Sequence, residues 1–206
     1  MVARKKNENG TRENILQAAD ELFGENGFDA ASTRLIAERC GVNKALIHYH
    51  FSSKQKLFEA VLDRYYDRLQ TALAPLLAEE GSASDRMLLV IDGYMDFLAD
   101  NTSFCRLLQR EVVGEQHLTR ILAHMVPLFK AGELVLHSAY PASASGTLAA
   151  RELLLSFFGM IVSTYTYSPA IAGLIADDPL SQDNLEKRKR HIRFMAELVL
   201  RELEGE

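Results

Sequence analysis

The side chains best suited to bind another molecule through charge and hydrogen bonds are concentrated between residues 33 and 54 of this 206-residue chain. The segment is TRLIAERCGVNKALIHYHFSSK. A helix that enters a DNA major groove needs hydrogen-bond donors near its N-terminus and small residues where the backbone comes close, and Lys44 and Ala45 meet these needs. Three further side chains suit phosphate oxygens: His48, Tyr49 and His50. The predicted chemistry is therefore hydrogen bonding to DNA.

Two short helices joined by a glycine turn are predicted to position these side chains. Ser32 and Thr33 are small hydroxyl residues that can cap the start of the first helix. Gly41 ends that helix, because glycine takes the left-handed conformation without a Cβ clash. Asn43 can then accept hydrogen bonds from the free N–H groups of the second helix. The predicted helix-turn-helix spans residues 32–51.

The second helix is predicted to have two different faces. Ile47 and Phe51 lie four residues apart and share one face, which can be buried. The opposite face carries polar and small side chains: Lys44, Ala45, His48 and Tyr49. Metal binding by His48 and His50 is not expected, because residues two apart on a helix point to different sides and no third ligand follows at a suitable spacing. Ordinary packing remains the alternative for Tyr49.

Residues 11–66 resemble the DNA-binding domain of the TetR family of bacterial transcription regulators. The resemblance covers a three-helix block and is not limited to the helix-turn-helix. It rests on these motifs: Leu22-Phe23-Gly24-Glu25-Asn26-Gly27-Phe28 at the end of the first helix, Ile36-Ala37, Gly41-Val42, His48-Tyr49-His50-Phe51, and Lys54 followed by Leu57-Phe58.

The resemblance implies DNA contacts at ten positions: Thr33, Arg34, Asn43, Lys44, Ala45, Leu46, His48, Tyr49, His50 and Lys54. Among them, Arg34 and Lys44 are expected to reach base edges. Two positions depart from the family pattern. Leu46 stands where a small or hydroxyl residue is usual, and His48 stands where a phosphate-binding tyrosine is usual. A leucine at the first of these positions can instead contact a thymine methyl group.

Composition and charge agree with a DNA-binding protein that has a hydrophobic core. Hydrophobic residues make up 48% of the chain, which is enough for one small and one medium domain. The net charge of −5 is unevenly divided, because residues 1–56 carry nine Lys and Arg against seven acidic residues, a net +2, and the remainder is net −7. The basic end is the expected DNA-binding end, and the acidic remainder keeps away from the phosphate backbone.

Cysteine usage and the lack of long apolar runs predict a cytoplasmic protein. Cys40 and Cys105 are isolated and are expected to be small buried residues in a reducing cytosol; a redox sensor is the alternative. The N-terminus is polar, and the longest apolar run, residues 153–162, is too short for a bilayer. Neither a signal peptide nor a membrane span is therefore expected.

Helical periodicity fills nearly the whole chain, so the expected fold is all-α. Residues 1–10 are expected to form a flexible basic arm, in which Arg4, Lys5 and Lys6 either contact DNA or are solvated. Residues 11–56 are assigned to the TetR-type DNA-binding domain, and residues 57–206 to a helical domain for effector binding and dimerisation. Helices are expected over residues 11–26, from a capping box at 52–55 to about 76, and over 84–100, 103–114, 117–136, 147–167 and 183–204.

Two of these helices predict a homodimer. The helix over residues 147–167 is apolar around almost its whole circumference, so a second subunit is the natural cover for one side. Its small residues form a strip for close helix approach: Ser156, Gly159 and Ser163. The last helix carries apolar residues at a heptad spacing: Leu185, Ile192 and Val199, with Met195 between them. The expected interface is a four-helix arrangement with two helices from each chain, which is also how TetR-like regulators pair.

By resemblance, the middle helices should enclose a pocket for a small, largely apolar effector. The candidate lining residues are mostly aromatic: Tyr94, Phe97, Phe104, Leu108, Glu111, His124, Phe129, Phe158 and Tyr165. Core packing is the commoner explanation for each of them taken singly. His117 and His124 lie seven apart, and a position on the helix surface is the commoner explanation for both. No cofactor and no metal is expected.

The expected function is a dimeric transcriptional regulator, most simply a repressor that a ligand releases from a roughly palindromic DNA operator. A helical-bundle enzyme is disfavoured, because the sequence has no Gly-rich phosphate loop, nucleophile motif or paired ExxH set. A structural or partner-binding helical protein remains the alternative. The basic run at residues 187–190 is far from the helix-turn-helix and is expected to be a solvated face, with a second DNA patch as its alternative.

Overall fold

Every regular element in the described part of the chain is a helix, which confirms the predicted all-α class. The computed structural model describes the backbone of residues 2–114 and 117–205 and the side chains of residues 10–111 and 117–205. The elements are α1 (Val2–Ala30), α2 (Thr33–Cys40), α3 (Lys44–Phe51), α4 (Lys54–Leu77), α5 (Ala83–Asp100), α6 (Thr102–Gly114), α7 (Leu118–Ala139), the 3-10 helix η1 (Pro141–Ala144), α8 (Ala150–Thr166), α9 (Ser168–Ile175) and α10 (Gln182–Gly205).

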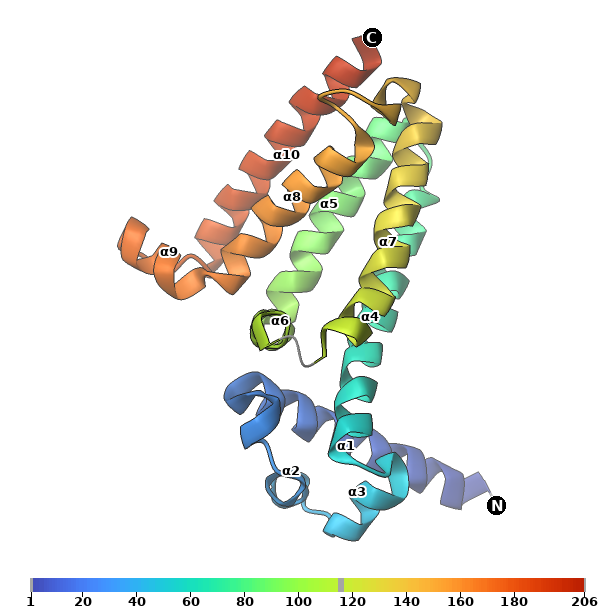
Figure 1. Cartoon of the computed structure of the whole chain (residues 1–206), viewed down its shortest axis with the longest axis vertical. Coiled ribbons are helices and arrows are strands. Elements are labelled where there is room, and N and C mark those ends of the chain that lie inside the picture. Colours follow the sequence, from blue (N-terminus) through green and yellow to red (C-terminus); the bar gives the residue numbers. More distant parts are fainter. Residues whose placement is uncertain (1, 115–116, 206) are drawn as a thin grey trace.

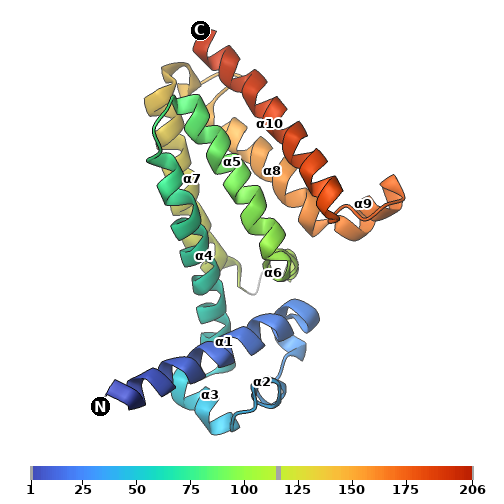
Figure 2. The same cartoon turned by 180° about the vertical axis from the view of Figure 1, so that it is seen from behind.

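The helices form two bodies along the long axis of the molecule (Figure 1). The lower body contains α1, α2, α3 and the first turns of α4, and the upper body contains the rest of α4 together with α5 to α10 (Figure 2). One hydrophobic cluster runs through both bodies, from Phe23 and Ile47 below to Met95 and Tyr165 above. The position of the lower body is therefore fixed by core packing.

The first helix is longer than predicted. α1 begins at Val2, so the backbone is helical where residues 1–10 were expected to form a flexible arm. No proline interrupts this stretch, and the helix therefore extends through it. Gly27 is non-helical, with φ 80° and ψ 171°, and breaks α1 near the predicted stop. The side chains of residues 4–6 lie outside the described residues, so their predicted DNA contact stays a prediction.

The long helix α4 joins the two bodies and is capped differently from the predicted box. Ser53 is its N-cap, and the Ser53 hydroxyl oxygen accepts a hydrogen bond from the backbone N–H of Lys56 at 3.1 Å. The third helical position is thus a lysine, which cannot complete a capping box. The Gln55 side-chain oxygen instead lies 3.0 Å from the Nε2 of His117, which directly precedes α7. Pro75 lies in the last turn of α4.

The upper body contains one helix that the sequence pattern did not predict. α9 follows α8 after a break at Tyr167 and is inclined to it by 81°. Pro169 lies in the first turn of α9, where its missing N–H is tolerated. Among the described residues, only this bent pair of helices is long and apolar enough in combination for a membrane span, and no single helix is.

Candidate nucleic-acid interface

The helix-turn-helix is held by the three capping contacts that its sequence predicts. The Ser32 hydroxyl oxygen accepts a hydrogen bond from the Leu35 N–H at 3.1 Å. Gly41 adopts the left-handed conformation, with φ 67°. The Asn43 side-chain oxygen accepts from the Ala45 N–H at 2.9 Å and so caps α3. Each contact satisfies a backbone group that a short helix leaves unpaired. The contacts therefore stabilise α2, the turn and α3.

Burial divides α3 as predicted into an inner and an outer face. Ile47 and Phe51 are 1% and 5% exposed and pack into the core of the lower body. We call the opposite side the α3 outer face; it consists of the exposed residues Lys44, Ala45, Leu46, His48 and Tyr49. Tyr49 is 71% exposed, so it is not a packing residue of this chain. The α3 outer face is available to a groove, and its individual DNA contacts stay predictions.

Arg34 lies in the first turn of α2. Its guanidinium Nε donates to the Glu38 carboxylate at 2.8 Å, and the side chain is 83% exposed. An exposed pair of this kind contributes little to stability. The arginine can therefore leave Glu38 for a nucleic acid at a small free-energy cost. Thr33 is half-buried, and His50 is half-buried with its ring 5.1 Å from that of Tyr49.

Two of the side chains predicted to contact DNA, Lys54 and His48, form contacts within the protein. The Lys54 ammonium donates to the backbone oxygens of Phe28 and Asp29 at 2.9 and 3.3 Å and lies 4.2 Å from the centre of the Phe28 ring. The His48 Nδ1 is 3.1 Å from the Ser52 carbonyl oxygen. The sequence could not reveal the lysine contact, because Phe28 and Lys54 meet only through the fold. Lys54 thus ties the end of α1 to the start of α4.

An additional cation lies next to the helix-turn-helix. The Arg12 guanidinium, from α1, is 5.1 Å from the centre of the Phe51 ring, and Arg12 is exposed. It lies 21 positions before the segment that carries the other candidates, so its closeness to α3 could not be predicted from local patterns.

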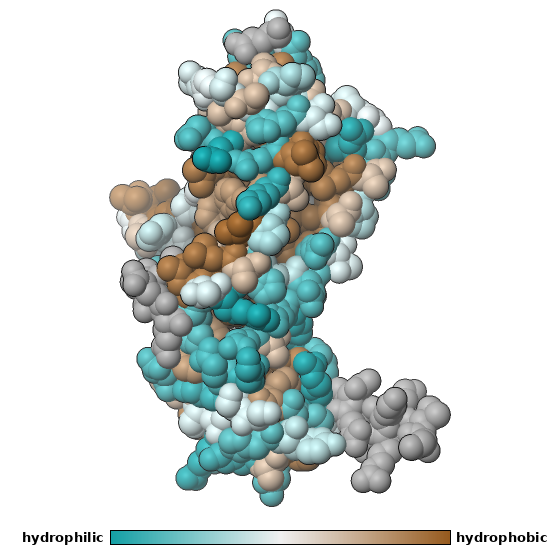
Figure 3. Space-filling view, turned by 45° about the vertical axis from the view of Figure 1, so that its right-hand side comes forward, coloured by the Kyte–Doolittle hydropathy of each residue, from teal (hydrophilic) through white to brown (hydrophobic). Residues whose placement is uncertain are grey.

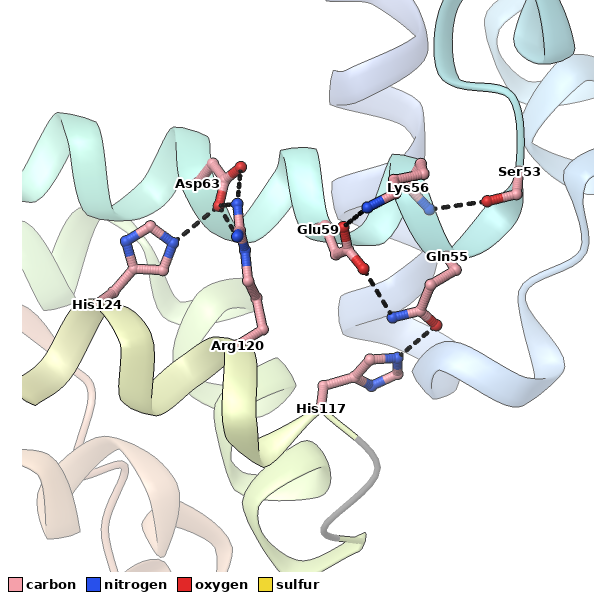
Figure 4. A network of polar contacts seen from close by, with 8 residues as sticks. All are labelled: Ser53, Gln55, Lys56, Glu59, Asp63, His117, Arg120 and His124. Carbon is pink, nitrogen blue, oxygen red and sulfur yellow. Dashed lines mark hydrogen bonds and ion pairs between the residues drawn. The ribbon is translucent and has the colours of Figure 1, made fainter.

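A buried histidine links the lower body to the start of α7. The His117 Nε2 is 3.0 Å from the Gln55 side-chain oxygen (Figure 4). The His117 Nδ1 bonds to the carboxylate of Glu111. The ring centre of His117 lies 4.5 and 4.2 Å from those of Phe28 and Phe58. Its side chain is 1% exposed. The prediction of a surface histidine was wrong, since α7 begins against α1 and α4.

A second polar contact joins α4 and α7 two turns further along (Figure 4). The Asp63 carboxylate accepts from the Arg120 Nε at 3.0 Å and lies 2.8 Å from the His124 Nε2. The His124 ring is stacked on Tyr66 at 4.5 Å. With His117, these residues form an α4–α7 junction, defined by Gln55, Asp63, His117, Arg120 and His124. A shift of α7 would therefore disturb α4, whose first turns belong to the lower body.

A buried carboxylate connects α1 to the upper body. The Asp20 side chain accepts from the Tyr65 hydroxyl at 2.6 Å and from the Arg64 guanidinium at 3.1 Å. The same Tyr65 hydroxyl lies 2.9 Å from that of Ser103 in α6. Burial raises the pKa of Asp20 above its ordinary value, against the lowering effect of Tyr65 and Arg64. The α1–α4–α6 contact is thus also polar and specific.

The predicted effector residues do not lie together around one cavity. Tyr94, Phe97, Phe104, Leu108 and Tyr165 belong to the main hydrophobic cluster or pack against it. Glu111 and His124 make the contacts described above, and Phe129 and Phe158 form an edge-to-face pair at 5.6 Å between α7 and α8. A cleft of about 720 Å³ between α1, α4 and α5 includes only Phe97 of the nine, and most of its lining is charged. The helical pattern could not distinguish core aromatics from pocket aromatics.

The predicted dimer residues of α10 mostly face their own chain. Ile192 is 0% exposed within its own chain, so the prediction that it contacts a partner was wrong. Leu185 and Val199 are half-buried against the core, and their part in a dimer stays a prediction. A heptad spacing determines which residues share a face but not which way that face points. The outward apolar residues of α10 are Phe194 and Leu198, 55% and 44% exposed. Met195 is half-buried.

The strip on α8 is only partly turned outward. Ser156 and Gly159 are exposed, and no atom lies within 4 Å of a Cβ placed on Gly159. Ser163 is half-buried, and its hydroxyl donates to the Met160 carbonyl oxygen at 3.3 Å. Leu155 on α8 is 51% exposed. We call five exposed, uncharged residues of these two helices the α8–α10 surface: Leu155, Ser156, Gly159, Phe194 and Leu198.

Parts of the chain are similar to known bacterial regulators. Residues 15–61 match the family model described as bacterial regulatory proteins, tetR family. The chain is 34% identical over 97 residues to the transcriptional activator FasR of Mycolicibacterium smegmatis, covering 47% of this chain and 44% of FasR. It is 28% identical over 121 residues to the nucleoid occlusion factor SlmA of a Marinomonas species, covering 58% and 60%. The chain thus spans about half the length of these curated relatives.

Solved structures extend the likeness to the whole fold. The structure of the regulator FadR from Bacillus subtilis in complex with stearoyl-CoA superposes with a TM-score of 0.69 at 18% identity, covering 89% of this chain and 96% of FadR. A TetR-like transcriptional regulator from a Rhodococcus species gives a TM-score of 0.63 at 19% identity, covering 95% and 97%. At these identities the likeness concerns the fold alone.

Proposed function

Since the chain belongs to the TetR family of bacterial transcriptional regulators, we propose that it is a homodimeric regulator that binds a specific DNA operator. The observation that carries this proposal is the α3 outer face, which presents Lys44 and Tyr49 to solvent on a helix whose inner face is buried. An exposed helix with a donor near its N-terminus is what major-groove recognition requires. We assign DNA binding to residues 11–56 and regulation to residues 57–206, with α4 shared between them.

Dimerisation is proposed through the α8–α10 surface. Surface apolar residues that cluster in this way are typical of protein interfaces. Two recognition helices then enter successive major grooves about 34 Å apart, which favours a roughly palindromic operator. A monomer would contact only one half-site and would lose most of the specific affinity.

A small, largely apolar effector is proposed for the upper body. The half-buried aromatic pair of Phe129 and Phe158 lies between α7 and α8, where a ligand can displace side chains without breaking a hydrogen bond. FadR, which shares the fold, was solved with a fatty acyl thioester of coenzyme A. Release of a repressor is the proposed outcome of ligand binding. FasR carries the name of an activator, so the direction of regulation needs its own test.

The alternatives are a helical partner-binding or structural protein and a helical-bundle enzyme. The family is one of transcriptional regulators and not of enzymes. A structural protein would have no need of the exposed donors on α3.

A DNA-binding titration tests the proposal directly. Fluorescence anisotropy with DNA from upstream of the gene should give specific binding that exceeds binding to a shuffled duplex of equal length by at least about 10³-fold. The same titration over a salt series measures the phosphate contribution. Equal affinity for both duplexes would exclude a sequence-specific regulator and favour the partner-binding alternative.

A further inference from the structure

The short helix α9 has almost no cover within its own chain. None of its residues is buried, and Leu174 and Ile175 are 84% and 49% exposed. Tyr167, which precedes the helix, is 59% exposed. A helix of eight residues is not stable through its own hydrogen bonds and depends on packing. An apolar helix in this position therefore needs a partner surface.

We propose that α9 is a dimer arm that packs against the middle of α7 of the second subunit. This inference rests on the proposed function, because it requires a homodimer. It goes beyond that function in assigning a separate contact, away from the α8–α10 surface.

The orientation of the dimer follows from the DNA-binding task. Both copies of α3 must meet one side of a duplex, so the two-fold axis runs roughly along the long axis of Figure 1. Rotation about such an axis keeps every element at its height and exchanges left and right. In Figure 1, α9 and the middle of α7 lie at similar heights on opposite sides of α8. An axis in front of α8 and α10 thus carries each α9 towards the α7 of the other subunit.

The middle of α7 offers a matching surface. Leu122 and Val126 lie one turn apart and are both 44% exposed. Residues 121–129 contain no Lys, Arg, Asp or Glu, and neither does α9. Figure 3 shows hydrophobic side chains gathered over the upper body on the side that includes α7 and α8. Two uncharged apolar surfaces can bury one another without desolvating charge.

Charged residues next to the two surfaces have opposite signs. Asp177 and Asp178 follow α9 directly, and exposed Lys130 follows the apolar stretch of α7. Docking of α9 on the partner α7 leaves these groups at the edge of the contact, where opposite charges favour one orientation over its reverse.

Paired cysteines test the contact in the full-length protein. Leu174→Cys and Val126→Cys are combined in a Cys40→Ser background and exposed to a mild oxidant. The buried thiol of Cys105 does not interfere, because desolvation raises its pKa to about 12. Leu174→Cys combined with Leu134→Cys is the matched control, since Leu134 is 70% exposed but lies two turns further along α7. Light scattering first establishes whether the unoxidised protein is dimeric.

The expected result is a covalent dimer in most chains of the Leu174→Cys and Val126→Cys variant and in few chains of the control pair or of either single variant. A dimeric protein with no such cross-link would overturn the α9 contact and leave the proposed function intact. Equal cross-linking by Leu174→Cys alone would show that α9 meets α9 and would also overturn it. A monomeric protein at micromolar concentration would instead contradict the proposed function itself.

A charge substitution gives an independent measurement. Leu174→Asp should raise the dimer dissociation constant at least about tenfold, because an aspartate would be buried unpaired in the contact. The exposure of Leu174 means that folding of the monomer is preserved. Leu89→Asp on α5, where the leucine is 37% exposed, is the control and should leave the constant unchanged. Equal dissociation constants for the two variants would contradict the inference.

Discussion

At the scale of single residues, two lysines ten positions apart illustrate the difference between recognition and support. Lys44 is exposed at the start of α3, whereas the ammonium of Lys54 binds the carbonyl oxygens of Phe28 and Asp29. Both are basic residues of the helix-turn-helix block, and the sequence pattern treats them alike. Their different surroundings give them different predicted roles.

Lys44→Ala should weaken operator binding by about 1 to 3 kcal/mol and relax the preference at one base pair in each half-site. The reason is the loss of a donor that we place at a base edge. Selection of binding sites from a random DNA library checks the second effect. Arg106→Ala, at an exposed position on α6, is the control. An unchanged sequence preference would remove Lys44 from base recognition.

Lys54→Ala should act mainly on stability. The substitution leaves two carbonyl oxygens at the end of α1 without their donor, which we expect to lower the free energy of unfolding by about 1 to 3 kcal/mol. Urea denaturation measures this loss. The salt dependence of DNA binding should stay close to that of the unmodified protein, because the ammonium is already occupied. A salt slope reduced by about one unit, with stability unchanged, would instead indicate that Lys54 contacts a DNA phosphate.

At the scale of elements, the α4–α7 junction connects the two bodies. His117 directly precedes α7, and its ring packs against both Phe28 and Phe58 of the lower body. The junction is small, yet it is buried at one end and bonded through charged groups at the other. Disturbing it should therefore uncouple the bodies before it unfolds either one.

His117→Phe preserves the ring packing and removes both polar contacts. We expect the Glu111 carboxylate, left buried without its partner, to destabilise the junction by about 1 to 3 kcal/mol. Calorimetry should then show two unfolding transitions in place of one. Gln55→Ala, which removes only the hydrogen bond to Nε2, should have a smaller effect. A single transition for both variants would mean that core packing alone couples the bodies.

Gly159→Leu tests the proposed α8–α10 surface. The site is open in the single subunit, so the added side chain fits without strain there. In a dimer that packs α8 closely against its partner, leucine should separate the helices and raise the dimer dissociation constant at least about tenfold. Sedimentation measures this change. Gly205→Leu, at another open glycine, serves as the control. An intact dimer would place Gly159 outside the interface.

Local elements were more predictable than contacts between them. The caps at Ser32, Gly41 and Asn43 depend on three or four neighbouring residues, and the sequence identified them all. His117 depends on residues about 60 to 90 positions away, which no local pattern encodes. Whether Ile192 faces the core or a partner depends on how α10 packs against the other helices, which the heptad spacing does not determine. α9 was missed because eight residues are too few for a periodic pattern to be distinguished from a loop.

At the scale of the whole molecule, a shared hydrophobic core couples the position of the lower body to the packing of the upper body. The hydrophobic cluster continues from α1 through α4 and α6 into α8, and the polar contacts of Asp20 and His117 accompany it. In the proposed dimer, a ligand that favours another arrangement of α7 and α8 is therefore expected to change the separation of the two α3 helices. It lowers operator affinity only by its differential affinity for the two arrangements.

An effector that releases the protein from DNA should itself bind more weakly when operator is saturating, by the same factor, because coupling between two binding equilibria is reciprocal. A thermal-shift screen of apolar metabolites finds candidates, since a ligand selective for the folded state raises Tm by mass action. The chain contains no tryptophan, so Phe158→Trp provides a single fluorescent reporter beside Phe129. Titration of each candidate with and without operator then yields both affinities. Ligands that bind tightly and change the fluorescence, yet leave operator affinity unaltered in either direction, would refute the ligand-controlled mechanism while leaving DNA recognition by α3 untouched.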